Sequence, residues 1–456
     1  MNKQTKEGLF SNQDLWVLIL PLMIEQFLAI SVGMADTMMV SHAGEAAVSG
    51  VSLVDMVNNV IIALLAALAT GGAVIISQCI GAGRGEDATK AAGQLELLAF
   101  VVAGAIAVVS IVLAHPLIGL LFGNIDEEVF AACKTYLIIT AISFPLLAIY
   151  NSGAAIFRSM GDSKTSMQVS VLMNVINIGG NGICVFGLGM GVEGVAIPSV
   201  ISRGVAAVLI TWLAARDKTR VHLNIQQVLH LDRSYMGRIL YIGIPSGIEN
   251  SLFQMGRVAV VSIIAGFGRV EIAANAIANN LDGLGITMGN AFGIAMITVV
   301  GRCVGAGAYD QSRHYAKKLL GWSYLSIILP AVFIILLQER FFALYQVSDA
   351  TKELASALVT IHMGMAMFLW PISFVLPNAL RAGADVGFTM GISLFSMAFF
   401  RLGISLVIAH TLQIGALGVW WAMVADWVFR ASCFGLRFLS GKWYHRNTLV
   451  QKEERE

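Results

Sequence analysis

The 456-residue sequence carries little charge, because Asp, Glu, Lys and Arg make up only 12% of it. Soluble domains average about 25% of these residues. Hydrophobic residues make up 57% of the chain, which leaves too few polar side chains to cover a water-facing surface. The formal net charge of +1 offers no electrostatic attraction to nucleic acid. We therefore expect an integral membrane protein whose partner is the lipid bilayer and not nucleic acid.

The sequence also lacks the short motifs of hydrolytic enzymes and of nucleotide-driven pumps. It contains no HExxH, GxSxG or GxxxxGK[ST] pattern. Its five cysteines form no CxxC pair, so neither a disulfide framework nor a zinc site is expected. The segment 1–14 is polar and holds no short apolar core, so we expect no cleaved signal peptide. These absences predict a protein without catalytic residues and without a cofactor.

Long apolar runs dominate what is present. Runs of about 20 residues or more can cross a bilayer as helices. Twelve such runs lie near 15–40, 51–79, 92–115, 131–157, 166–187, 194–214, 239–264, 274–300, 319–337, 354–380, 388–410 and 416–438. None shows the short alternating pattern of a membrane β-strand. The predicted fold is all-α, with twelve transmembrane helices.

The loops between these runs differ sharply in positive charge. Of the 29 Lys and Arg residues, 21 fall in one set of alternate loops and termini, and four fall within the runs. The other set of loops holds only Lys134, Arg269, Arg340 and Lys352. Because positive loops stay in the cytoplasm, we expect both termini there. The protein is predicted to be a multi-pass protein of the inner (plasma) membrane.

The chain divides near its middle into two halves that resemble each other. The pentapeptide CIGAG at 79–83 recurs as CVGAG at 303–307. Pro21 and Glu25 recur at the same offset as Pro245 and Glu249. Further copies are Gly194-Val195 with Gly418-Val419, and Arg158 and Asp162 with Arg381 and Asp385. The sequence thus contains an internal repeat that covers most of each half.

The repeat also predicts how the domains are organised. We expect an N-terminal six-helix bundle at 1–215, a cytoplasmic linker at 216–238, a C-terminal six-helix bundle at 239–440 and a cytoplasmic tail at 441–456. Six is an even number, so both halves enter the membrane in the same sense. The bundles are then related by a parallel repeat with a pseudo-two-fold axis along the membrane normal. Such a pair of bundles favours transport by alternating access.

Acidic residues inside the runs need a reason to be there, since each costs about 2.5–3.5 kcal/mol on insertion scales. The first run holds Glu25 and Asp36. Glu25 has a copy at Glu249, so these two can be structural. Asp36 has no copy, because Val260 occupies the equivalent position, and a one-sided carboxylate is harder to explain as scaffold. Asp282 in the eighth run can be either a paired charge or a site, and the lone His362 is expected to be satisfied by its neighbours.

Polar side chains also gather on the fifth run. Asn174, Asn177 and Asn181 are spaced three, four and seven apart and share one helix face, while Asn151 lies in the fourth run. These amides either join helices in lipid or form a polar pocket with Asp36. The spacing of Asp426 and Arg430, four residues apart, predicts a helical ion pair.

Several of these features together resemble the multidrug and toxic compound extrusion (MATE) family. They are Pro21, the interval to Ala35, Asp36 and Thr37, both copies of the Gly-Ala-Gly turn, and the glycine-rich segment 186–194. The resemblance implies a secondary active antiporter that exports amphipathic organic cations and drugs in exchange for H⁺ or Na⁺. The alternative is a lipid-linked precursor flippase of the same wider superfamily. A bacterial protein that acts as a monomer is expected.

The resemblance also implies roles for individual residues. Asp36 matches the coupling-ion aspartate of the first helix, and Asn177 and Asn181 match a fifth-helix pair of the DinF-like branch, although the second member here is Asn and not Asp. The tenth run, 354–380, holds no acid, which does not support the C-terminal cation site of the NorM-like branch. The coupling-ion candidates, with Na⁺ possible at Asp36, are Asp36, Asn177, Asn181, Asn174 and Asn151. The candidates for the substrate cleft are Glu25, Glu249, Asp282 and Met34.

Overall fold

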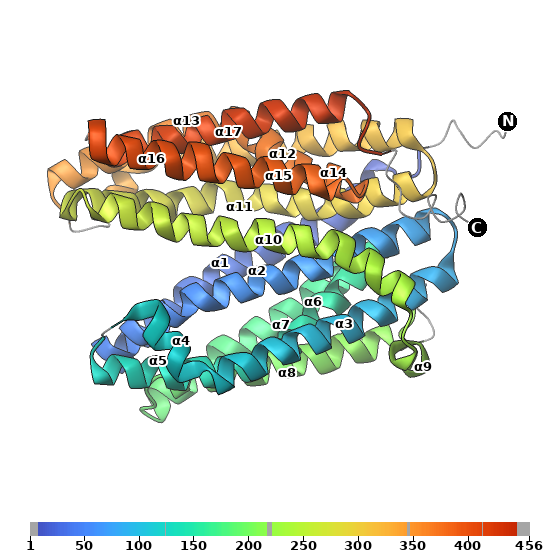
Figure 1. The fold of residues 1–456 in the computed structure, drawn as a ribbon, viewed down its shortest axis with the longest axis horizontal. Helices are drawn as coiled ribbons and strands as arrows, with labels where there is room; N and C mark the ends of the chain where they lie inside the picture. Colours follow the sequence, from blue (N-terminus) through green and yellow to red (C-terminus); the bar gives the residue numbers. More distant parts are fainter. Residues whose placement is uncertain (1–7, 124, 217–220, 344–346, 413, 445–456) are drawn as a thin grey trace. The chain divides into compact units, whose positions relative to one another are not determined.

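The computed structural model describes residues 8–123, 125–216, 221–343, 347–412 and 414–444. Within these ranges the chain is helical nearly throughout and contains no β-strand. It forms two units (Figure 1), which are residues 12–247 and residues 248–456 together with 1–11. We call them the N-terminal unit and the C-terminal unit and describe each separately.

Every predicted apolar run lies on a helix. Among the described residues, nine helices are long and apolar enough to cross a membrane, or ten if the bent pair α5 (Glu127–Ile142) and α6 (Phe144–Ser159) is one span. The other two predicted runs lie on α10 (Arg233–Ala265) and α17 (Ala416–Leu439). Polar residues within these two helices lower their hydropathy. The predicted all-α fold with twelve transmembrane helices is confirmed.

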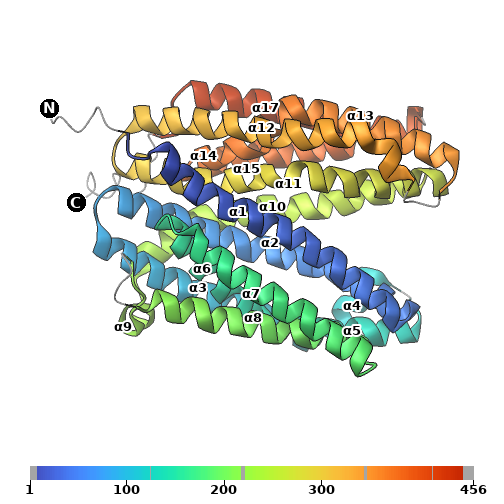
Figure 2. The same ribbon diagram turned by 180° about the vertical axis from the view of Figure 1, so that it is seen from behind.

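The N-terminal unit is built around two groups of neighbouring helices. Helix α7 packs against both α1 and α8, and α2 packs against α3, α5 and α6 (Figure 2). Its elements are α1 (Asn12–Val40), η2 (Ser41–Ala43), α2 (Glu45–Gly81), α3 (Gly85–Val112), α4 (Ala114–Phe122), α5, α6, α7 (Ser163–Gly182), η3 (Ile183–Gly187), α8 (Glu193–Ala214), α9 (Ile225–Leu229) and the first part of α10.

A glycine allows the close approach of α7 and α8. A Cβ placed on Gly180 would lie 2.7 Å from the Cβ of Pro198 on α8, well inside van der Waals contact. Small residues at such crossings bring membrane helices close enough for polar side chains to reach across. Gly180 precedes Asn181, so this contact sets the distance between the polar face of α7 and its neighbour.

The C-terminal unit is centred on α11, which packs against α12, α13 and α14. Three of its helical stretches, η4, η5 and η6, are π-helical. Its elements are the second part of α10, α11 (Arg269–Gly305), α12 (Tyr309–Phe342), α13 (Asp349–Trp370), η4 (Pro371–Val375), α14 (Leu376–Ala382), α15 (Val386–Ser396), η5 (Met397–Gly403), α16 (Ile404–Val407), η6 (Ile408–Leu412) and α17.

The internal repeat is visible in backbone detail. Helices α2 and α11 each span 37 residues and end in the repeated pentapeptide. Gly83 and Gly307 then adopt φ values of 74° and 67°, a conformation that favours glycine. The amides of Arg84 and Ala308 close the two turns with bonds to the carbonyl oxygens of Cys79 and Cys303, both at 2.9 Å. The sequence repeat is therefore a structural repeat.

Candidate functional site

The unrepeated Asp36 lies in a chain of hydrogen bonds that joins three helices of the N-terminal unit. Asn181 Nδ2 on α7 donates to Asp36 Oδ1 on α1 at 2.7 Å. The same nitrogen lies 3.4 Å from Asn177 Oδ1, and Asn177 Nδ2 donates to Ser199 Oγ on α8 at 2.9 Å. The predicted face of the fifth span thus meets the carboxylate of the first.

This chain leaves one acceptor unused. Asn181 is fully buried, and within the described ranges its Oδ1 has no hydrogen-bond partner. A buried polar atom without a partner costs about 1–3 kcal/mol, so such atoms in native structures have a reason. Here the unused oxygen belongs to the same amide group that donates to the Asp36 carboxylate. Together they offer oxygen ligands to a hard cation, or an acceptor to a protonated acid.

A second acid lies close to Asp36. Asp55 on α2 accepts from Tyr136 Oη at 3.1 Å and from Asn58 Nδ2 at 3.4 Å. Arg203 on α8 interacts electrostatically with both Asp36 and Asp55, and it donates to Ser143 Oγ at 2.6 Å. Two carboxylates thus interact electrostatically with one guanidinium, and the three groups together carry one net negative charge when all are ionised. No partner for Arg203 could be predicted from the sequence, because its neighbours lie on other helices.

The remaining candidates of the N-terminal unit lie on α1, α6 and α7. Asn174 lies on α7, two turns before Asn181, and Asn151 lies on α6. In the described part of the chain neither of them has a hydrogen bond to Asp36, so their roles stay predictions. Met34 lies on α1 two residues before Asp36, and its side chain is outside the described residues.

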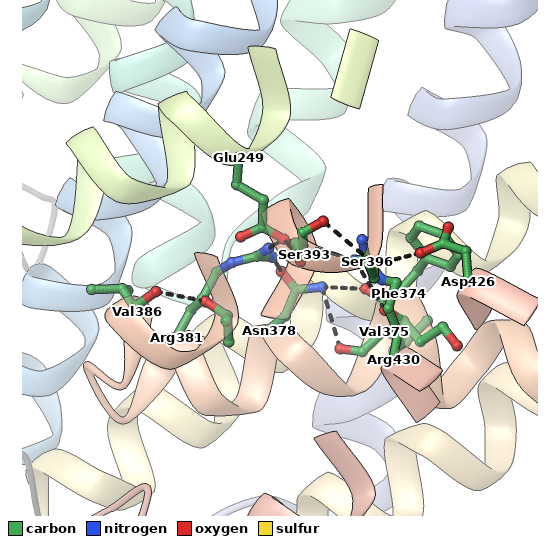
Figure 3. Close-up of polar contacts among 12 residues, drawn as sticks. Glu249, Phe374, Val375, Asn378, Arg381, Val386, Ser393, Ser396, Asp426 and Arg430 are labelled. Atoms are coloured by element: carbon green, nitrogen blue, oxygen red, sulfur yellow. Dashed lines mark hydrogen bonds and ion pairs between the residues drawn. The ribbon is translucent and has the colours of Figure 1, made fainter. Parts of the chain in front are cut away.

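The repeated glutamates form ion pairs with the repeated arginines. In the N-terminal unit, Glu25 Oε1 lies 2.5 Å from Arg158 Nη2. In the C-terminal unit, Glu249 Oε1 lies 2.8 Å from Arg381 Nη2 (Figure 3). Both glutamates are buried, and each pair links an early helix of its unit to a later one. This arrangement favours the structural interpretation of Glu25 and Glu249 over a role in a substrate cleft.

Glu249 belongs to a larger buried network (Figure 3). Ser393 Oγ donates to Glu249 Oε1 at 2.6 Å, and Arg430 Nη2 lies 3.7 Å from the same oxygen. Asp426 accepts from Ser396 and pairs with Arg401 Nε at 3.3 Å. The predicted pair of Asp426 with Arg430 is therefore wrong, because each has a closer partner on another element.

Asp282 also has a partner, which the sequence did not reveal. His362 Nδ1 on α13 lies 2.5 Å from Asp282 Oδ1 on α11. The two residues lie on different helices, far apart in the chain, so no local pattern could pair them.

Comparisons with known proteins match both units. The MatE family model matches residues 21–183 and 245–407. The chain is 30% identical to the "Probable multidrug resistance protein NorM" of Thermotoga maritima, over 97% of this chain and 96% of that protein. It is 26% identical to the "Uncharacterized transporter YisQ" of Bacillus subtilis, over 95% of each.

The solved structures that resemble the chain share its fold. One is described as the "outward-facing conformation of a multidrug resistance MATE family transporter of the MOP superfamily". It has a TM-score of 0.87 at 21% identity and covers 94% of this chain and 96% of that one. Another, a MOP superfamily transporter from Pyrococcus furiosus, has a TM-score of 0.86 at 21% identity, with 94% and 95% covered.

Proposed function

Because this chain belongs to the MATE family, whose members are membrane transporters and not enzymes, we propose that it is an antiporter that exports amphipathic organic cations and drugs in exchange for H⁺ or Na⁺. The observation that carries the proposal is the hydrogen-bond chain from Asp36 through Asn181 and Asn177. The relatives named as multidrug resistance proteins support the class of substrate.

The coupling cation would bind at Asp36. With Asp36 and Asp55 ionised beside Arg203, the cluster carries one excess negative charge inside the membrane, which a single H⁺ or Na⁺ neutralises. A sodium ion would use the carboxylate and the unused Oδ1 of Asn181 as ligands. A proton on Asp36 would instead give this oxygen a donor. Either cation removes the cost of an uncompensated buried charge.

Binding at Asp36 would act on helix arrangement, because the cluster joins α1 to α7 and α8. Asn181 is followed almost at once by the π-helical segment η3, and such segments are frequent at functional sites. Exchange requires only that the cation and the substrate prefer different conformations of the protein. The charge of Asp36 would change the relative stability of these conformations through the contact between α1 and α7.

The charges of the N-terminal unit favour cationic substrates. Four acids, Glu25, Asp36, Asp55 and Glu96, lie within its predicted runs, where Arg203 is the one base away from the ends of a run; Lys134 and Arg158 lie at the two ends of the fourth run. An acidic excess attracts organic cations and disfavours the pyrophosphate of a lipid-linked precursor. Two features support our proposal that the chain belongs to the DinF-like branch. Asn181 of the fifth span contacts Asp36, and the tenth predicted run, 354–380, contains no acid. We further propose a plasma-membrane location with cytoplasmic termini, on the strength of the loop charges.

The test uses purified protein in liposomes with ethidium as the substrate. An imposed H⁺ or Na⁺ gradient alone should drive ethidium transport in the wild type. Asp36→Asn, which fixes the neutral form, should fold and bind ethidium but lose gradient-driven transport. Glu45→Gln, at the exposed start of α2, is the matched control and should behave like the wild type. Wild-type rates and ion dependence in Asp36→Asn would refute the proposed role, and movement of a lipid-linked precursor without any ethidium transport would favour the flippase.

A further inference from the structure

The C-terminal unit contains a buried pair of titratable side chains that the proposed coupling at Asp36 does not use. His362 Nδ1 lies 2.5 Å from Asp282 Oδ1, and the two side chains are 3% and 14% exposed. In the described ranges neither of these atoms has another hydrogen-bond partner. Within the described residues, each of these two atoms therefore has the other as its one close polar partner.

Two tryptophans of α17 enclose the imidazole. The His362 ring lies 4.7 Å from the ring of Trp420 and 4.4 Å from that of Trp427. Trp420 Nε1 is held by Asn275 Oδ1 on α11 at 3.0 Å. Aromatic rings and a carboxylate both stabilise a cationic imidazole. The imidazole of His362 thus lies between the Asp282 carboxylate and two indole rings of α17.

The internal repeat shows that packing does not require this pair. Asp282 occupies the same position along α11 as Asn58 does along α2, and His362 occupies the same position along α13 as Thr140 does along α5. At this place in the N-terminal unit, Asn58 Nδ2 lies 3.5 Å from Thr140 Oγ1. A neutral amide and a hydroxyl therefore suffice to join these two helices. Joining helices therefore does not explain why the C-terminal unit has the titratable pair of Asp282 and His362 at this place.

Charged groups near the pair are themselves largely compensated. Arg401 on η5 interacts electrostatically with Asp282, but it is also paired with Asp426 of α17. Arg430 of α17 and Arg381 of α14 both form ion pairs with Glu249. From the other packed elements, Arg257 of α10 neighbours Arg401, and Tyr324 of α12 donates to the Phe368 carbonyl oxygen on α13. When His362 is protonated, its imidazolium is therefore the positive charge nearest to the Asp282 carboxylate.

We propose that Asp282 and His362 form a second proton-binding site, located in the C-terminal unit and independent of the Asp36 cluster. The imidazole takes its proton from water and returns it to water. When protonated, it forms an ion pair that ties α13 to α11. When deprotonated, it leaves the Asp282 carboxylate facing a neutral ring, and the tie weakens.

The position of the site suggests what it acts on. Helix α13 continues directly into η4, a π-helical segment that begins at Pro371. Because π-helical segments and prolines are the points at which long helices bend, a change in the hold on α13 can be relieved there. Proton release at His362 would therefore weaken the contact of α13 with α11 close to η4, the segment at which the helix can bend.

The tryptophans supply a readout that does not depend on transport. A protonated imidazole in contact with an indole quenches its fluorescence, so tryptophan emission of the full chain in lipid nanodiscs should show a step between pH 5 and 9. His362→Gln should remove this step. The double variant Asp282→Asn/His362→Thr, which copies the neutral pair of the N-terminal unit, should remove it while keeping the thermal stability of the wild type. Asp282→Asn alone should move the midpoint to lower pH.

Two further variants separate this inference from the function proposed above. His115→Gln, a histidine whose ring contacts Phe130 and no tryptophan in the described residues, should leave the step unchanged. Asp36→Asn should lose gradient-driven transport and keep the fluorescence step. A wild type without a step, or a step that persists in both His362 variants, would overturn the second site and leave the role of Asp36 untouched.

Discussion

Replacing Glu249 by Gln would test whether its ion pairs hold the C-terminal unit together. Glu249 is 4% exposed, accepts from Ser393, and faces two buried guanidinium groups, those of Arg381 at 2.8 Å and Arg430 at 3.7 Å. Gln keeps the size of the side chain but removes its charge. Arg381 then loses the carboxylate it pairs with, and Arg430 loses one of the two carboxylates, Glu249 and Asp426, that interact with it electrostatically. Breaking a buried pair in this way costs about 3–5 kcal/mol.

The equivalent change in the N-terminal unit should be milder. Glu25 faces one guanidinium, that of Arg158, whose side chain is 18% exposed and can still reach water. Loss of one charged hydrogen bond costs about 1.5–3 kcal/mol. Glu249→Gln should therefore lower the melting temperature on the order of 10 °C, and Glu25→Gln by less. The two repeats provide a matched comparison within one protein.

The assay is a thermal scan of each purified variant in the same detergent, followed by transport in liposomes. The double variant Glu249→Gln/Arg381→Gln should regain part of the lost stability, because it also removes the buried charge of Arg381 that the single variant leaves without its partner. A Glu249→Gln variant that melted like the wild type yet lost gradient-driven transport would refute the structural role of these ion pairs. Glu249 would then act in transport and not in the scaffold.

Two further predictions concern the coupling site and the orientation. Asn181→Asp places a second carboxylate beside Asp36, within the present 2.7 Å contact, and should shift the pH dependence of ethidium transport by about one pH unit or more; an unchanged profile would show that the two residues do not act together. In intact cells, Ser348→Cys should react with an impermeant maleimide and Asp310→Cys should not, since the loop charges predict that Asp310 faces the cytoplasm. The reverse labelling would overturn the predicted orientation.

The helices could be predicted from the sequence because lipid leaves few alternatives. A run of about 20 apolar residues must satisfy its own backbone, so hydropathy alone located spans such as 15–40 and 274–300. The same reasoning holds for α10 and α17, whose polar residues lower their hydropathy but whose repeat partners, α1 and α8, are clearly apolar. The runs 239–264 and 416–438 were predicted as apolar runs like the others, and the repeat agrees with that prediction.

Contacts between helices were predictable only where the sequence supplied a second clue. Asn181 was placed near Asp36 through the shared face of its asparagines and the family resemblance, and the structure brings the two together. The pair of Asp426 and Arg430 rested on local spacing alone, and it failed because Arg401 approaches Asp426 from another element. Local spacing predicts which side chains of one helix are close enough to pair. Which pairs form also depends on side chains that approach from other helices.

The two repeats also differ in an informative way along their second helices. Helix α2 carries Asp55 and Asn58, whereas α11 carries Asn279 and Asp282 at the same two positions, so acid and amide have exchanged places. Each acid reaches the fourth span of its own unit, Asp55 through Tyr136 and Asp282 through His362. A structural requirement would repeat the same residue at the same position, as the pairs of Glu25 and Glu249 with their arginines do. The exchange instead leaves one acid at these two positions in each unit, displaced by about one helical turn and held by a different partner. This is the arrangement expected if the two units bind protons independently.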